Sequence, residues 1–287
     1  MPFVEANGIR LHYQSVGSGR PLVFCHEYAS DARAWEAQLR AFGRRYNVVA
    51  YNGRGYPPSA VPEDDEAWLH RHLVDDLLGL LDALGIERAH IVGQATGGNV
   101  ALNFALAHPE RVIGLVVVGA GAGTSDRERW LAGARALADD IAARGTARAF
   151  ASIEQAPQRA IFQTKDPRGW QDFLSLLHDL SPIAAEKLMR ITLTDRLPVT
   201  ALRDQLAKLD RPVLVMTGDQ DFPSHEACRF IRDHAPYAGL AMLPMCGHAM
   251  NLEEPMLFNQ ALSDFLSAVD AGRWGSWSDR EVAGEQR

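Results

Sequence analysis

The chain has 287 residues, 47% of them hydrophobic, and a formal net charge of −7. This length and apolar content suffice for a large core within one folded unit. The acidic charge argues against a nucleic-acid partner, which would favour a basic surface, and no apolar run approaches the about 18 to 20 residues of a membrane span.

The amino-terminal residues, MPFVEANG, lack the basic and apolar regions of a secretory signal. The three cysteines are too few and too scattered for a disulfide framework or a zinc site. We therefore expect a reduced, cytoplasmic protein with no membrane or nucleic-acid partner and no bound metal.

Short apolar runs alternate with amphipathic helical patterns over the first 120 residues. Residues 3–6 and 9–16 are predicted to form a hairpin because Asn7-Gly8, between them, is a strong turn signal. Further strands are predicted at 22–25, 46–51, 91–92 and 112–118, and helices at 31–42, 67–84 and 97–107. This alternation is typical of a mostly parallel β-sheet flanked by helices.

The strand pattern stops after residue 120 and returns at 212–216 and 240–243, before a last helix at 255–269. The intervening stretch shows only helical patterns and several aromatic residues, which predicts a cap over one end of the sheet. We therefore expect a core of residues 1–120 and 210–270, a helical cap of residues 121–209, and a loosely held tail of residues 271–287 that contains Trp274 and Trp277.

The segment HIVGQATGGN, residues 90–99, has the pattern of a strand, a sharp turn and a helix start. It matches the Gly-x-Ser-x-Gly nucleophile elbow except at its centre. Glycines suit such a turn because they let the backbone segments approach closely. The central residue, however, is Ala95, and a methyl group cannot attack a carbonyl carbon.

Polar residues also follow three other predicted strands. They are Asp219 and Asp221, His248, and the triplet His26-Glu27-Tyr28. Because sites in open α/β sheets lie beyond the carboxyl ends of the strands, we expect these residues to lie near Ala95.

Together these motifs resemble those of the α/β-hydrolase fold family, in particular its capped esterases, lactonases and C–C hydrolases. The resemblance extends from Phe3 to Val269 and includes the loop NGRGYPPS at 52–59. It implies an α/β-hydrolase fold and a catalytic triad in the order nucleophile, acid, histidine. Carried over, these positions are Ala95, Asp221 and His248.

The resemblance also implies a role for each residue of the site. His248 would act as the general base, and Asp221 would hold its tautomer and stabilise the imidazolium. The backbone N–H groups of Thr96 and Tyr28 would form the oxyanion hole. Glu27 departs from the glycine of the family pattern, and we expect it either to bind a cationic group of the substrate or to pair with Arg54 or another cation.

The sequence also offers alternatives for these roles. Asp219 is interpreted as a turn residue, and Asp126 occupies another placement known for the acid in this fold. Thr96 is a poor substitute nucleophile because it begins the helix and should point elsewhere. Further candidates for contact with the substrate are His26, Glu27, Gln94 and the cap residue Trp130.

The predicted parent activity is hydrolysis of a small carboxylic ester or lactone through an acyl-enzyme, without a cofactor; C–C bond hydrolysis by the same triad is the alternative. In one hypothesis, Ala95 was introduced deliberately in place of a serine, which disarms the enzyme. In the other, the alanine is native, and the protein is a ligand-binding sensor or a cofactor-free catalyst based on His248. The sequence does not indicate an oligomeric state.

Overall fold

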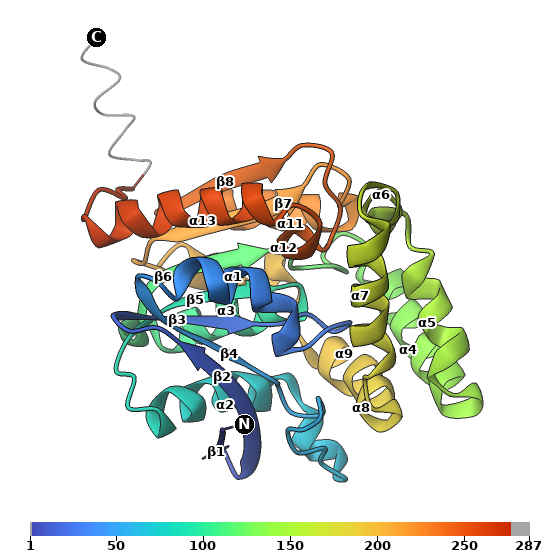
Figure 1. Cartoon of the computed structure of the whole chain (residues 1–287). Helices are drawn as coiled ribbons and strands as arrows, with labels where there is room; N and C mark the ends of the chain where they lie inside the picture. Colours follow the sequence, from blue (N-terminus) through green and yellow to red (C-terminus); the bar gives the residue numbers. More distant parts are fainter. Residues whose placement is uncertain (1, 277–287) are drawn as a thin grey trace.

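The computed structural model, which describes residues 2–276, is built around one eight-stranded sheet (Figure 1). The strand order is β1-β2-β4-β3-β5-β6-β7-β8. The first two strands form an antiparallel hairpin, β2 pairs antiparallel with β4, and the remaining strand pairs are parallel. The strands are β1 (Phe3–Ala6), β2 (Ile9–Val16), β3 (Arg20–Cys25), β4 (Tyr46–Tyr51), β5 (Ala89–Gln94), β6 (Val112–Val118), β7 (Val213–Gly218) and β8 (Ala238–Leu243).

Helices cover both faces of this sheet, as the alternation of apolar runs predicted. On one face, α2 (His70–Ala83), α3 (Thr96–Ala107) and α11 (Phe222–His234) bury their apolar residues. On the other face, α1 (Glu36–Phe42), α12 (Met250–Glu253) and α13 (Pro255–Asp270) do the same. The central strands are buried on both sides and consist of continuous apolar residues, as parallel strands between two helical layers should. The predicted fold class is therefore confirmed.

The insertion between β6 and β7 consists of helices in the part of the chain that the structure describes. Its helices are α4 (Arg127–Arg144), α5 (Thr146–Glu154), α6 (Pro157–Lys165), α7 (Pro167–His178), α8 (Pro182–Lys187), α9 (Leu193–Asp195) and α10 (Arg203–Leu206), with a π-helical turn η4 (Leu188–Thr192) and a 3-10 turn η5 (Val199–Leu202). Figure 1 shows this helical insertion, which is called the cap below as a label only, beside the edge where the parallel strands end. Its own core is aromatic: Phe150, Phe162, Trp170 and Phe173 are buried.

Three further 3-10 turns join elements of the core: η1 (Ala32–Trp35), η2 (Asp65–Trp68) and η3 (Pro109–Arg111). No helix among residues 2–276 is both long enough and apolar enough to cross a membrane.

The first residues of the predicted loose tail are held against the core. The indole N–H of Trp274 donates to the carbonyl oxygen of Tyr237 at 2.7 Å, and the ring packs edge-on against Phe265 at 4.7 Å between centroids. Gly239 leaves room for the ring, since a Cβ there would lie 2.8 Å from it. Partial burial of a large indole thus anchors the chain up to this point, while Trp277 lies outside the described residues.

Candidate active site

The backbone of the nucleophile elbow is complete around Ala95. This residue joins β5 to α3 with φ 48° and ψ −108°, a strained conformation for a residue other than glycine. A Cβ on Gly93 would lie 2.1 Å from the carbonyl oxygen of Gly97, and one on Gly97 would lie 2.2 Å from that of Cys25. Both glycines are therefore required by close backbone contact, and the turn presents the side chain of Ala95 to the cavity.

The histidine and the acid of the predicted triad form a hydrogen-bonded dyad. His248 Nδ1 lies 2.9 Å from Asp221 Oδ2, and the Asp221 side chain is 1% exposed. The hydroxyl of Ser224, in the first turn of α11, donates to the same carboxylate oxygen at 2.6 Å. Gly119 avoids a steric clash with the dyad, because a Cβ there would lie 3.0 Å from Asp221 Oδ2. No sequence motif pointed to Ser224.

Charge makes the His248–Asp221 pair mutually stabilising. Burial by itself lowers the pKa of His248, but the charge and hydrogen bond of Asp221, with a further contribution from Glu27, raise the pKa above its ordinary value. Burial by itself raises the pKa of Asp221, but the imidazolium and the Ser224 hydroxyl bring the pKa below its ordinary value. The dyad therefore favours a protonated histidine beside an ionised carboxylate.

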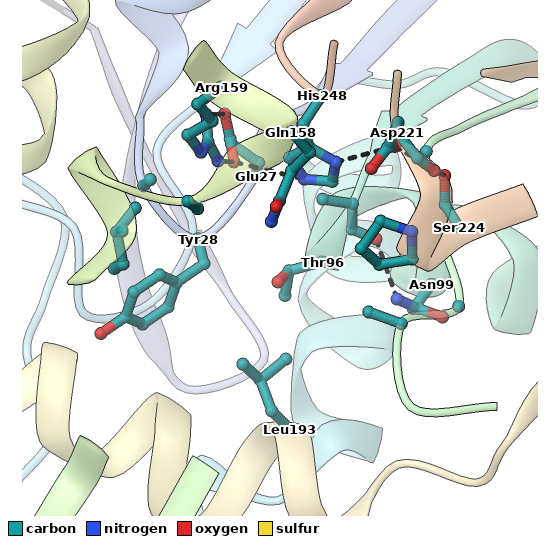
Figure 2. Close-up of a pocket in the computed structure, with 18 of the residues that line it drawn as sticks. Glu27, Tyr28, Thr96, Asn99, Gln158, Arg159, Leu193, Asp221, Ser224 and His248 are labelled. Atoms are coloured by element: carbon teal, nitrogen blue, oxygen red, sulfur yellow. Dashed lines mark hydrogen bonds and ion pairs between the residues drawn. The ribbon is translucent and has the colours of Figure 1, made fainter. Parts of the chain in front are cut away.

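A second carboxylate, that of Glu27, lies on the other side of the histidine ring. Its Oε2 is 3.8 Å from His248 Nε2 and 2.5 Å from Nη2 of Arg159, which α6 of the cap contributes (Figure 2). The Glu27 and Arg159 side chains are 3% and 5% exposed. Burial opposes ionisation of Glu27, but the positive charges of Arg159 and His248 outweigh it, so the pKa lies below its ordinary value.

Of the cations expected as partners of Glu27, Arg54 is not the one that the structure shows. Arg54 forms a buried ion pair with Asp76 on α2 instead, at 2.5 Å. The partner is another cation, as the second expectation had it: Arg159, which lies 132 positions away along the chain. Only the docking of the cap on the core brings these two residues together.

The two expected oxyanion-hole residues both lie at the cavity (Figure 2). Thr96 is the first residue of α3, and Tyr28 lies in the loop after β3. Within residues 2–276 the structure records no hydrogen bond from the backbone N–H of either residue. The Tyr28 hydroxyl donates to the carbonyl oxygen of Ala185 at 3.0 Å, which ties this loop to the cap.

His26 and Gln94, expected as substrate contacts, do not line the cavity. His26 accepts the N–H of Gly53 at Nε2, at 3.0 Å, and its Nδ1 lies 2.7 Å from the carbonyl oxygen of Glu27, so both ring nitrogens are engaged by backbone. The amide of Gln94 donates to the carbonyl oxygen of His248 at 2.9 Å. Both side chains therefore hold loops of the site in place, which corrects the prediction for these two residues.

The alternative acids lie elsewhere. The carboxylate of Asp219 accepts the backbone N–H of Cys246 at 3.1 Å, as a turn residue would. Asp126 caps α4 by accepting the N–H of Arg129 at 3.2 Å. Among the described residues, the carboxylate hydrogen-bonded to His248 is that of Asp221.

The cavity above Ala95 has a volume of about 270 Å³ and lies between the core and the cap. The core contributes Ala95, Thr96 and His248, while the cap contributes Trp130, Met189 and Leu193. Its lining is mostly apolar with a few polar groups, as is typical of a small-molecule site.

In the described part of the chain the three cysteines are buried, and no metal centre is evident. Cys25 and Cys228 are buried, and burial raises the pKa of both thiols to about 12, which disfavours the reactive thiolate. Residues 2–276 contain no cluster of histidine, cysteine and acidic side chains that could hold a metal ion.

The chain is similar in sequence and in structure to several known proteins. RutD from Caulobacter sp. strain K31, provisionally named a carbamate hydrolase, is 30% identical over 245 residues, covering 83% of this chain and 87% of that protein. The 3-oxoadipate enol-lactonase 2 of Acinetobacter baylyi is 28% identical over 268 residues, covering 90% and 94%. The crystal structure of a hydrolase from Pseudomonas aeruginosa PA01 superposes with a TM-score of 0.81 at 27% identity, covering 92% of this chain and 97% of that one.

Two of these proteins are named as hydrolases and one as an enol-lactonase, and the Pseudomonas structure shares the architecture described above. The family model for the alpha/beta hydrolase fold matches residues 20–255, a span that includes the elbow, the dyad and the cap. This chain therefore belongs to the α/β-hydrolase fold family.

Proposed function

We propose that the cavity is the substrate site of a small carboxylic ester or lactone hydrolase in which alanine occupies the nucleophile position. The observation that carries this proposal is the intact frame around Ala95. The strained elbow is retained, and the His248–Asp221 pair, at 2.9 Å, lines the same cavity. A chain that had long lost catalysis would be free to lose these residues, so we infer that Ala95 stands in place of a serine, as in a deliberately disarmed enzyme.

Each group has a defined task once a serine stands at position 95. The hydroxyl attacks the carbonyl carbon while His248 takes its proton and Asp221 stabilises the resulting imidazolium. The N–H groups of Thr96 and Tyr28 donate to the oxygen that becomes negative. With Ala95 in place there is no attacking oxygen, so the chain binds substrate without forming an acyl-enzyme. The names of the relatives, an enol-lactonase and a carbamate hydrolase, support an acyl compound as substrate.

The test is the Ala95→Ser variant, which we call the serine-restored variant. It is assayed beside the present chain on p-nitrophenyl acetate and butyrate, a set of lactones, and a vinylogous diketone that reports C–C hydrolysis by the same residues. Loss of a triad nucleophile costs up to about 10⁶-fold in kcat, so we expect a gain of at least about 10³-fold that His248→Ala abolishes. Mass spectrometry of the quenched reaction should show the acyl adduct on residue 95. No gain and no adduct with any substrate would refute the proposal.

One observation favours a second candidate, a cofactor-free catalyst or ligand sensor with a native alanine. His248 lies between two carboxylates, with Asp221 at Nδ1 and Glu27 3.8 Å from Nε2, an arrangement that favours a held proton. Such a histidine can donate a proton to a bound substrate without a covalent step. Turnover by the present chain that His248→Ala removes, with no benefit from the serine-restored variant, would favour catalysis of this kind.

A further inference from the structure

A buried arginine at the cavity lacks an acidic partner. Arg196, between α9 and η5, is 3% exposed. Its Nη2 donates to the carbonyl oxygen of Ala122 at 2.6 Å, its Nη1 donates to Asn99 Oδ1 at 3.3 Å, and its guanidinium lies 5.2 Å from the centroid of the Trp130 ring. Its Nε–H has no hydrogen-bond partner among the described residues.

The charge of Arg196 is not neutralised within the described part of the chain. No carboxylate forms an ion pair with it there, and a second cation, Arg127, donates to its backbone carbonyl oxygen. Burial, followed by repulsion from Arg127, lowers the pKa of Arg196 to about 10, so it still carries its charge at neutral pH. Arginine is rarely buried without a partner, because removing an isolated charge from water is costly. This environment therefore favours an incoming anion.

The position of Arg196 relates it directly to the reacting centre. It lines the same cavity as Ala95 and His248. Asn99 links Arg196 to the elbow. Its Oδ1 accepts from Arg196, while its Nδ2 donates to the carbonyl oxygen of Ala95 at 2.9 Å (Figure 2 shows this second bond). Ala95 and Arg196 are thus connected through one amide side chain, and the cavity of about 270 Å³ that both line limits a ligand touching both to a small molecule.

The other charges of the cavity are already compensated. Glu27 pairs with Arg159, and Asp221 pairs with His248. These pairings leave the guanidinium of Arg196 as the uncompensated charge at the cavity wall. A ligand carboxylate in the cavity would form charge-assisted hydrogen bonds with the guanidinium, whose planar fork is well suited to this anion.

We propose that Arg196 forms a subsite for the carboxylate of the substrate, which makes the substrate a short acid that carries its ester or lactone group a few bonds away. This inference rests on the proposed function for the ester end of the ligand. The binding experiment itself does not depend on turnover, because the present chain lacks a nucleophile at Ala95.

The experiment compares half-esters with their diesters on the present chain. Monomethyl succinate, glutarate and adipate are titrated at neutral pH by ligand-observed NMR, beside the dimethyl ester of each acid, which has similar length and no charge. A hydrogen bond to a charged group typically contributes enough for a preference of about 10- to 100-fold in Kd. We expect at least one half-ester to show such a preference over its diester.

Two variants assign this preference to one side chain. Arg196→Met should remove the preference for half-esters, whereas Arg203→Met should retain it. Arg203 is a matched control because it also belongs to the cap and lies 5.3 Å from the centroid of an aromatic ring, but its side chain is exposed. If Arg196→Met does not fold, Arg196→Lys replaces it and should reduce the preference at least about threefold, because an ammonium lacks the planar fork. An Arg196 that only supports the structure would change thermal stability and leave the ratio of Kd values unaltered.

Equal Kd values for half-esters and diesters of every length, or an unchanged preference in a folded Arg196 variant, would overturn the inference. The serine-restored variant separates this failure from that of the proposed function. Hydrolysis of diesters and half-esters at equal efficiency would retain the ester hydrolase and reject the carboxylate subsite. Half-ester binding that depends on Arg196, without hydrolysis by the serine-restored variant, would retain the carboxylate subsite and reject the ester hydrolase.

Discussion

The buried pair of Glu27 and Arg159 makes a quantitative prediction about stability. Both side chains are at most 5% exposed, and the shortest contact is 2.5 Å. Glu27→Gln leaves Arg159 buried beside a neutral amide, so the free energy of unfolding should fall by about 3–5 kcal/mol, the usual effect of breaking a buried pair. The double variant Glu27→Gln/Arg159→Met buries no charge at this site and should recover most of that loss.

Urea denaturation of the four proteins of this double-mutant cycle gives the coupling free energy. The matched control is Glu36→Gln, which breaks the pair that Glu36 forms with Arg40 on α1, with side chains that are 53% and 80% exposed. An exposed pair of this kind contributes at most about 0.5 kcal/mol. If Glu27→Gln costs no more than the control, or if the double variant is as unstable as the single one, the reasoning about burial is wrong.

The same variants should move the pKa of His248 in opposite directions. Glu27→Gln removes a carboxylate 3.8 Å from Nε2 and leaves the charge of Arg159, so the pKa of His248 should fall. Arg159→Met leaves the carboxylate without its cation, so the pKa should rise. The NMR signal of the His248 ring, followed through a pH titration, measures both shifts. Shifts in the same direction would mean that the pair does not act on His248 through its charges.

Three further results are expected. Gly97→Ala should lower the free energy of unfolding by at least about 1–3 kcal/mol in urea denaturation, because its Cβ would lie 2.2 Å from a carbonyl oxygen. Gly133→Ala on α4 has nothing within 4 Å of its Cβ and should raise the free energy of unfolding by about 0.5–1 kcal/mol. Similar effects of the two substitutions would contradict the close-contact argument. In the serine-restored variant, Asp221→Asn should lower kcat by about 10⁴-fold while Asp219→Asn should retain most of kcat, and comparable losses would reassign the acid. Since the pKa of Glu27 lies below its ordinary 4.5, the stability that its ionised carboxylate contributes is present above that pH and is lost as the pH falls through the folded-state pKa. The double variant Glu27→Gln/Arg159→Met should therefore lose less stability than the parent on acidification. Measuring the free energy of unfolding as a function of acidic pH would test this.

The fold could be predicted from local patterns because each core element has a clear one. The Asn7-Gly8 turn set the hairpin, whose strands have the bounds expected from sequence, and the apolar run at 112–118 corresponds to β6. The extent of the last described segment could not be predicted in this way. Trp274 looks like part of a polar tail in the sequence, and its anchoring depends on Gly239 and Phe265, which only the folded chain brings next to it.

The site was predictable where the backbone motif determines where a side chain lies, and not elsewhere. Ala95 sits on a turn whose glycines fix its direction, and the structure places it at the same cavity as Asp221 and His248, as expected. His26 and Gln94 also stand at strand ends, but whether such a side chain faces the cavity or a neighbouring loop depends on the nearest backbone hydrogen-bonding group, a donor for His26 and an acceptor for Gln94. In both cases a backbone group of the site is within hydrogen-bonding distance, and the side chain binds it.

The charged residues that the cap contributes to the cavity could not be identified from the sequence. Arg159 and Arg196 both come from the insertion, where arginines are numerous and none belongs to a motif. One meets a buried carboxylate of the core, Glu27, and the other meets an amide and a carbonyl. The core therefore determines which cap arginine is neutralised, and the one left over determines the charge that the cavity offers a ligand. On this view, exchanging Asn99 for aspartate would place a carboxylate beside Arg196, and should abolish the preference for half-esters without any change to the arginine itself.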